Sequence, residues 1–181
     1  MKVKFFLFML ASISLLTSCN SKKAEYDPYN IGEEIDTTKV VSKGVFEVEF
    51  KDAGNYTKII HVKLNDAAGF DALFDTGCSY VSISQIEAAP LIKAGTLSES
   101  DYSGKDIPIS IADGTTGYKK VYKLKAVSVI DTKGQVHTLY DVPTTIEANP
   151  RATFLLGTYV IDNLAKKSYT VDLKKSVIRF E

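Results

Sequence analysis

The sequence Ala72-Leu73-Phe74-Asp75-Thr76-Gly77 is the most informative part of this chain, and the apolar run Val81-Ser82-Ile83 follows it closely. The Asp-Thr-Gly triplet alone is a weak signal, because Asp and Gly are frequent turn formers and a plain turn between two strands would use the same residues. Here, however, apolar strand-like segments flank the triplet, and Leu155-Leu156-Gly157 follows 80 residues later. The order of these segments therefore carries more information than the triplet.

Short strands and tight turns make up most of the chain from Gly44 onward. The segment 58–64 alternates apolar and polar residues, and turn residues bound it on both sides, as in a β-hairpin. Strands are predicted over 45–50, 58–64, 70–74, 81–83, 107–111, 120–130, 136–140, 142–146, 169–173 and 177–180. About ten strands with one or two short helices indicate a mostly β fold, a barrel or a sandwich.

Two helical segments interrupt the strands. Ser84-Gln85-Ile86-Glu87 has the capping-box pattern, with Ser at the N-cap and Glu three residues later. Because proline disrupts a helix interior, Pro90 predicts either a short helix that ends near Ala89 or two short helices, with Gly95 as the stop. A second helix is predicted over residues 158–165, after the Leu-Leu-Gly triplet.

In the order and spacing of these parts, the chain resembles the retropepsin-like aspartic proteases, the single-lobed relatives of pepsin found in retroviruses and in bacteria. The matching parts are the strand ending in Asp75-Thr76-Gly77, the strand 81–83, the turn Asp113–Gly117 at the position of the flap, Leu155-Leu156-Gly157 and the final hairpin. The match covers nearly all of the predicted domain, residues 44–181. The resemblance implies an acid-protease fold: mostly β, a closed irregular barrel with one or two short helices.

Aspartic protease chemistry needs two carboxylates that face each other across one water. Two such charges about 3 Å apart cannot both ionise, so the pair shares a proton. This chain has one Asp-Thr-Gly, and its other candidate aspartates sit in polar turn contexts without an apolar strand before them: Asp66, Asp71, Asp113, Asp131 and Asp141. A complete site therefore requires two copies, each contributing Asp75. The prediction is a homodimeric aspartic endopeptidase acting on a peptide or protein substrate.

The resemblance also implies roles for the residues around Asp75. Thr76 would hydrogen-bond across the two-fold axis, and Gly77 would let the loop pass close to the carboxylate without a Cβ in the way. The segment Asp113-Gly114-Thr115-Thr116-Gly117 is the candidate flap, which would cover the substrate and exclude water, although a plain hairpin turn is the alternative. Leu155, Leu156 and Gly157 would support the active-site loop without taking part in the chemistry.

The chain departs from the family pattern at two places. Cys78 follows the triplet where relatives usually have Ala or Ser; it fits as a small packing residue, and the alternative is an oxidation-sensitive position beside the site. A Cys nucleophile is disfavoured, because no His is matched to it. Viral relatives also carry an Arg after the Leu-Leu-Gly-like segment that helps to build their dimer, whereas this chain has Thr158 and Tyr159.

The first residues have the form of a bacterial lipoprotein signal. Lys2 and Lys4 precede an apolar run of about a dozen residues that ends in Leu16-Thr17-Ser18-Cys19, which resembles a lipobox. A membrane span would need roughly 20 apolar residues. The prediction is a signal peptide over residues 1–18, with Cys19 lipidated and holding the protein to a membrane surface. An ordinary signal peptide that contains a Cys is the alternative.

Residues 19–43 are polar and charged and show no strand or helix periodicity, so they are predicted to form a flexible tether. The alternative is that part of this segment packs on the domain as an extra strand. The protein is therefore predicted to be exported and lipid-anchored to the cell envelope. Asn20 after Cys19 favours the outer membrane or the periplasmic face.

Composition excludes several other functions. The 22 basic and 22 acidic residues form no basic patch, so no nucleic-acid partner is expected. Two histidines and Cys78 lack metal-ligand spacing, so neither a metal nor another cofactor is expected. His61 and His137 alternate with apolar neighbours and are predicted to face solvent.

A fold does not fix a function, so two other hypotheses remain open. One is a catalytically inactive lipoprotein of the same fold that binds a peptide or a partner protein, which a strictly monomeric state would favour. The other is a structural lipoprotein with a chance Asp-Thr-Gly.

Overall fold

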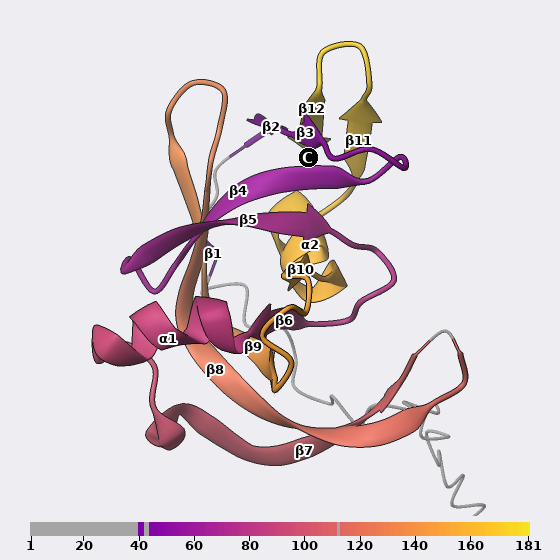
Figure 1. The fold of residues 1–181 in the computed structure, drawn as a ribbon. Helices are drawn as coiled ribbons and strands as arrows, with labels where there is room; N and C mark the ends of the chain where they lie inside the picture. The colour runs from indigo at the N-terminus through magenta and orange to yellow at the C-terminus, as the bar shows by residue number, and fades with distance from the viewer. Residues whose placement is uncertain (1–39, 42–43, 112) are drawn as a thin grey trace, which may run out of the picture. The chain divides into compact units, whose positions relative to one another are not determined.

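The computed structural model describes residues 40–41, 44–111 and 113–181, which belong to one folded unit. The predicted signal peptide, Cys19 and most of the predicted tether lie outside the described residues. The strands (Figure 1) are β1 Val40–Val41, β2 Phe46–Glu49, β3 Lys51–Asp52, β4 Lys58–Leu64, β5 Ala68–Phe74, β6 Val81–Ser84, β7 Tyr102–Ser110, β8 Thr116–Ile130, β9 Val136–Glu147, β10 Leu155–Leu156, β11 Tyr169–Asp172 and β12 Val177–Phe180.

The helical segments are α1 Gln85–Lys93, the 3-10 turn η2 Glu99–Asp101 and α2 Thr158–Ala165. In the part of the chain that the structure describes, no helix is long and apolar enough to cross a membrane. The mostly β fold with two short α-helices confirms the predicted fold class.

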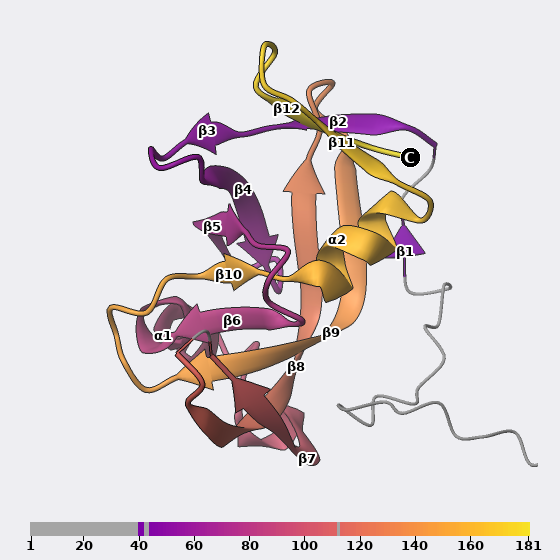
Figure 2. The same ribbon diagram turned by 90° about the vertical axis from the view of Figure 1, so that its right-hand side faces the viewer.

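Nine strands form the larger sheet. They pair in the order β1-β9-β6-β10-β5-β4-β8-β7, with β3 added to β4. The long strand β8 also pairs with β9, so the sheet curves back on itself (Figure 2). Because β1 and β7 stand at the ends of this order, the sheet is irregular rather than simply closed as a barrel. A separate three-stranded sheet has the order β11-β12-β2.

Alternation along β4 builds one side of the core. Ile60, Val62 and Leu64 are buried, as the pattern predicts, and the side chains between them are exposed. Burial of each such apolar side chain stabilises the fold by about 1.5–3 kcal/mol. Leu156 of β10 and Ile161 of α2 belong to the same core cluster. The core therefore joins the strand before Asp75 to the segment that packs behind it.

The helix α1 differs from the prediction at Pro90. Its start is as expected, because Ser84 and Glu87 form the capping box. The helix nevertheless continues through Pro90 to its last turn. The next residue, Leu91, is fully buried, and its packing offsets the hydrogen bond that proline cannot donate. Gly95 ends the helix with a φ of 68°, a conformation that glycine adopts without strain.

The strand β9 is one continuous element where two strands were predicted. Asp141 was expected in a turn and has a positive φ of 54°. Pairing with β8 continues on both sides of it, with Ala126 opposite Tyr140 and Leu124 opposite Val142. The polar residue therefore marks an irregularity within a strand, because the cross-strand pairs on each side hold the ladder together.

At the N-terminal end of the described residues, Val40 and Val41 form the short strand β1. They pair antiparallel with Leu139 and Thr138 of β9. These two residues lie in the predicted tether, and their pairing matches the alternative that part of this segment adds a strand to the domain. The remainder of the tether stays a prediction.

The predicted exposure of the two histidines is right for one and wrong for the other. His61 is exposed and lies 2.9 Å from a carboxylate oxygen of Asp71, which belongs to β5 rather than to a turn. His137 is only 3% exposed, and its ring stacks on Phe46 with centroids 3.6 Å apart. On β9 the core face holds His137 and Leu139, whereas Val136 is exposed. The sequence analysis therefore assigned the wrong face of β9 to the core, because the polar His137 occupies a core-facing position.

Asp131 makes the burial of His137 possible and supplies a pH-dependent part of the stability. Its Oδ2 lies 3.0 Å from His137 Nε2, and its Oδ1 accepts the backbone N–H groups of Lys133 and Gln135, each at 2.8 Å. Burial acts to raise the pKa of Asp131, but the hydrogen bond from His137 and the two backbone bonds outweigh it. The pKa of this carboxyl is therefore held below its usual range.

We expect this lowered pKa to appear in the acid stability of the protein. A carboxyl with a lower pKa in the folded state contributes stability above its unfolded pKa of about 3.9 and loses it as the pH falls through the folded value. The free energy of unfolding, measured in urea between about pH 5 and pH 2, should thus fall more steeply for wild type than for Asp131→Asn. Equal slopes would show that Asp131 does not make this contribution.

Candidate active site

Asp75 stands at the point where β5 ends, and β10 fixes its backbone. The β10 strand pairs in parallel with β5, and Leu155 pairs with Ser82 of β6 on the other side. The Asp75 N–H donates to the carbonyl of Leu156 at 3.1 Å. The three-residue sequence Leu-Leu-Gly thus enters between the two strands that flank the segment 75–80, which we term the Asp75 loop.

Within the Asp75 loop, the carboxylate is held by the backbone that follows it. Asp75 Oδ1 accepts the N–H of Gly77 at 2.8 Å, an Asx-type turn. A Cβ at Gly77 would lie only 3.2 Å from this oxygen, so glycine gives the carboxylate its space. Asp75 is half-buried, whereas Thr76 and Gly77 are exposed. One carboxylate oxygen is therefore fixed at the surface of the domain.

The helix α2 braces the loop from behind. The N–H groups of Thr158 and Tyr159, at its first turn, donate to the carbonyls of Cys78 and Ser79 at 2.8 and 2.9 Å. These are donors that a helix N-terminus leaves without partners inside the helix. The chain comes so close that a Cβ on Gly157 would lie 2.2 Å from the Tyr80 carbonyl oxygen. Only glycine fits at this contact, and Figure 2 shows β10 leading into α2 there.

Cys78 is a half-buried thiol inside the Asp75 loop. Its Sγ donates to the carbonyl of Tyr80 at 3.2 Å. Burial raises the pKa of the Cys78 thiol, and the charge of Asp75 acts in the same direction. The residue is therefore held as a neutral thiol, which agrees with its interpretation as a small packing residue.

Because only the thiolate is nucleophilic, Cys78 should react slowly with alkylating reagents in the folded protein. In a chain carrying Cys19→Ser, we expect iodoacetamide at pH 8 to modify Cys78 at least about tenfold more slowly in the native state than in urea. Mass spectrometry of the quenched samples measures this ratio. Equal rates would indicate an exposed, ionisable thiol and the oxidation-sensitive alternative.

The candidate flap lies at the turn of the β7–β8 hairpin, at the lower right of Figure 1. Asp113 Oδ1 accepts the N–H of Thr115 at 2.8 Å, and Gly114 adopts a φ of 86°. Thr116 and Gly117 do not belong to the turn, because they are the first two residues of β8. The structure therefore places the five predicted residues together, and their role as a flap remains a prediction.

The base of this hairpin packs on the Asp75 loop and on α2. Tyr80, which ends the loop, forms a small apolar cluster with Ile107 of β7 and Val121 of β8. Tyr159 of α2 and Ile109 of β7 pack at its margin. The inner face of the β7–β8 hairpin is thereby fixed next to the segment that carries Asp75.

An ion pair beside this cluster was missed by the sequence analysis. Lys119 of β8 pairs with Glu147 at the end of β9, and Glu147 Oε1 also accepts the Ser82 hydroxyl at 3.1 Å. Burial lowers the pKa of Lys119. Neither residue belongs to a motif; only the strand register, which brings β8 and β9 close to β6, reveals the pair.

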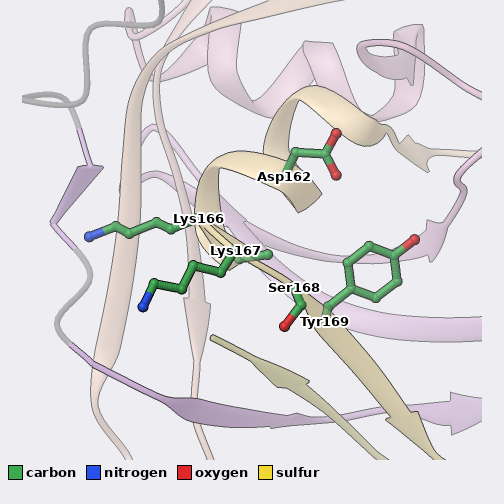
Figure 3. Close-up of a pocket in the computed structure, with 6 residues that line it drawn as sticks. Asp162, Lys166, Lys167, Ser168 and Tyr169 are labelled. Carbon is green, nitrogen blue, oxygen red and sulfur yellow. The ribbon is translucent and has the colours of Figure 1, made fainter.

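A separate hollow of about 340 Å³ lies at the other end of α2 (Figure 3). Its lining residues are Asp162, Ala165, Lys166, Lys167, Ser168 and Tyr169. The Asp75 loop contacts the opposite, N-terminal end of this helix through the carbonyls of Cys78 and Ser79, so the hollow is distinct from it. Among the described residues, no group of three or more His, Cys, Asp or Glu side chains is placed to hold a metal ion.

These features define a retropepsin-like fold, in which a strand ending in Asp-Thr-Gly is braced by a Leu-Leu-Gly segment and a following helix. No family model and no curated protein sequence matches the chain. Eighteen chains of solved structures match its fold. One is a retropepsin-like aspartic protease from Rickettsia conorii, with a TM-score of 0.51 and 15% identity, covering 78% of this chain and 90% of that one. At this identity, the similarity concerns the fold alone.

Proposed function

We propose that this protein is an aspartic endopeptidase that acts as a homodimer and is tethered to the cell envelope through a lipid on Cys19. The observation that carries the proposal is the geometry of Asp75. Its carboxylate is half-buried at the end of a core strand and is held by the Gly77 N–H, while β10 and α2 brace the loop. The similarity of the fold to an aspartic protease supports the same class of reaction.

The chemistry follows from a pair of Asp75 carboxyls that share one proton. The ionised carboxylate takes a proton from a water between them, and the hydroxide attacks the scissile carbonyl carbon. The protonated partner donates its proton to the carbonyl oxygen, which gives a neutral tetrahedral intermediate. When the C–N bond breaks, the leaving nitrogen takes up the proton that came from water, and one hydroxyl of the intermediate returns its proton to the other carboxylate. The products are one carboxylic acid and one amine, and the two Asp75 carboxyls again share one proton.

The dimer is required because each chain supplies one Asp-Thr-Gly. In a two-fold assembly, the exposed Thr76 and Gly77 would lie near the axis, and the half-buried Asp75 would face its mate. The substrate would be an extended peptide between the Asp75 loops and the β7–β8 hairpins. Such a peptide gains affinity from backbone hydrogen bonds to strand edges, and side-chain pockets give specificity.

The proposal is tested by measuring the mass in solution of the Cys19→Ser chain between pH 4 and pH 7. Cleavage of a mixed peptide library is followed by mass spectrometry in the same samples. We expect a dimer that cuts internal peptide bonds. A strict monomer without cleavage at any pH would contradict the proposal and favour the protein that keeps this fold and binds peptides or partner proteins.

A further inference from the structure

The inner face of the β7–β8 hairpin carries a cation. In the antiparallel register, Ile107 stands opposite Lys119. Residues two apart on a strand share a face, so Lys119 points to the same side as Val121, which packs on Tyr80. The two neighbours of Lys119 along the strand, Tyr118 and Lys120, point outward. Tyr118, for example, is 78% exposed. Lys119 therefore lies on the face of the hairpin that packs on the Asp75 loop through Val121 and Tyr80.

The anion that pairs with Lys119 belongs to the body of the domain. Glu147 is the last residue of β9, and it stands beside Ser84 in the parallel pairing of β9 with β6. Its Oε1 also accepts the hydroxyl of Ser82 at 3.1 Å, so two body strands determine where the carboxylate lies. The ion pair thus connects a hairpin that projects from the sheet to strands that lie within it.

A second ion pair on the same hairpin provides an internal comparison. Lys120, the next residue, faces outward and pairs with Glu99 of η2 at 3.0 Å. Its side chain and that of Glu99 are 54% and 72% exposed, whereas those of Lys119 and Glu147 are 28% and 21% exposed. Exposed pairs are screened by solvent and contribute little, and half-buried pairs are screened less. Of the two ion pairs, only the inner one is therefore expected to add to the apolar cluster around Tyr80 in holding the hairpin against the body.

We propose that the Lys119–Glu147 ion pair positions the β7–β8 hairpin over the Asp75 loop and so sets the width of the peptide groove. Both are positioning residues that act through the hairpin. The inference deepens the proposed function and rests on it for its catalytic consequence, but closure of the hairpin is measurable without cleavage. Loss of either charge would leave the other half-buried without its partner and would let the hairpin move outward.

The experiment compares four variants of the chain carrying Cys19→Ser: Lys119→Met, Glu147→Gln, the charge swap Lys119→Glu with Glu147→Lys, and the outer-pair control Glu99→Gln. Amide hydrogen exchange of residues 102–120 reports hairpin opening. We expect exchange about tenfold faster in each inner single variant, recovery in the swap and wild-type exchange in the control. The swap is compatible with Ser82, because a hydroxyl both donates and accepts hydrogen bonds.

Peptide cleavage in the same variants gives the functional readout. The inner single variants should raise KM about tenfold with a smaller change in kcat, and the swap should reverse the effect, because the hairpin acts on substrate binding. Unchanged exchange in the hairpin, or an increase spread over the whole domain, would overturn the inference. The variants could show the expected exchange pattern while the wild-type protein cuts no peptide. That outcome would support the positioning role of the ion pair and refute only the proposed function.

Discussion

Replacement of Asp75 by Asn should lower kcat/KM for peptide cleavage by about a thousandfold or more, because an amide cannot take a proton from the attacking water. The loss would arise at the chemical step, since Asn has the same shape as Asp. The Gly77 N–H, which lies 2.8 Å from Asp75 Oδ1 in the wild-type structure, can still donate to the side-chain oxygen of Asn. Thermal unfolding of the variant, followed by circular dichroism, should give a midpoint close to that of wild type.

A matched control lies on the same strand. Asp71 is exposed on β5, and its carboxylate contacts the side chains of His61 and Lys51, so Asp71→Asn should leave cleavage unchanged. Cleavage that survives in Asp75→Asn, measured with protein free of contaminating protease, would remove Asp75 from the chemistry. The triplet would then be a turn between two strands.

The largest expected effect on stability is that of Gly157→Ala. The added Cβ would lie 2.2 Å from the Tyr80 carbonyl oxygen and 2.5 Å from that of Cys78, both of them backbone atoms that cannot turn away. The contact must therefore be relieved by separating α2 from the Asp75 loop. We expect a loss of about 3 kcal/mol or more in the free energy of unfolding, at the upper end for overpacking, or a chain that does not fold.

Gly117→Ala is the control for this substitution, because no atom lies within 4 Å of a Cβ at Gly117 and its backbone φ is not positive. It should change the unfolding free energy by less than about 0.5 kcal/mol in the same urea titration. A stable Gly157→Ala protein would show that the Leu-Leu-Gly segment does not brace the loop as closely as the structure indicates.

The parts of the fold that the sequence predicts are those in which local pattern and packing agree. The alternation in β4, the capping box at Ser84 and the Gly95 stop each satisfy a local rule, and the structure confirms them. The expectation that Leu155, Leu156 and Gly157 support the loop after Asp75 came from the resemblance to a family. Local chemistry alone does not place two segments 80 residues apart in one parallel pair.

The misjudged elements are those where tertiary packing overrides a local preference. Pro90 stays within α1 because Leu91 anchors the helix in the core. His137 is buried because Asp131 and the ring of Phe46 provide its partners, and both come from outside its own strand. Such partners are distant in sequence or lie across a turn. The pattern of polar and apolar residues along one strand therefore does not predict them.

The Lys119–Glu147 pair was beyond sequence analysis for a related reason. Lys119 and Lys120 are adjacent and chemically identical, yet one lies on the face of the hairpin that packs on the Asp75 loop and the other faces solvent. The register of β8 decides which is which, and that register follows from pairing with both β7 and β9. The sequence therefore shows two lysines, and only the fold distinguishes their roles.

The central claim is that two chains share one active site, and a mixing experiment tests it most directly. Wild-type chains are equilibrated with increasing amounts of Asp75→Asn chains, and cleavage is expressed per wild-type chain. With random pairing at equal amounts, about half of the wild-type chains have an inactive partner, so activity per wild-type chain should fall to about half. It should approach zero as the variant is added in excess. Activity per wild-type chain that stays constant would contradict a site built from two copies of Asp75.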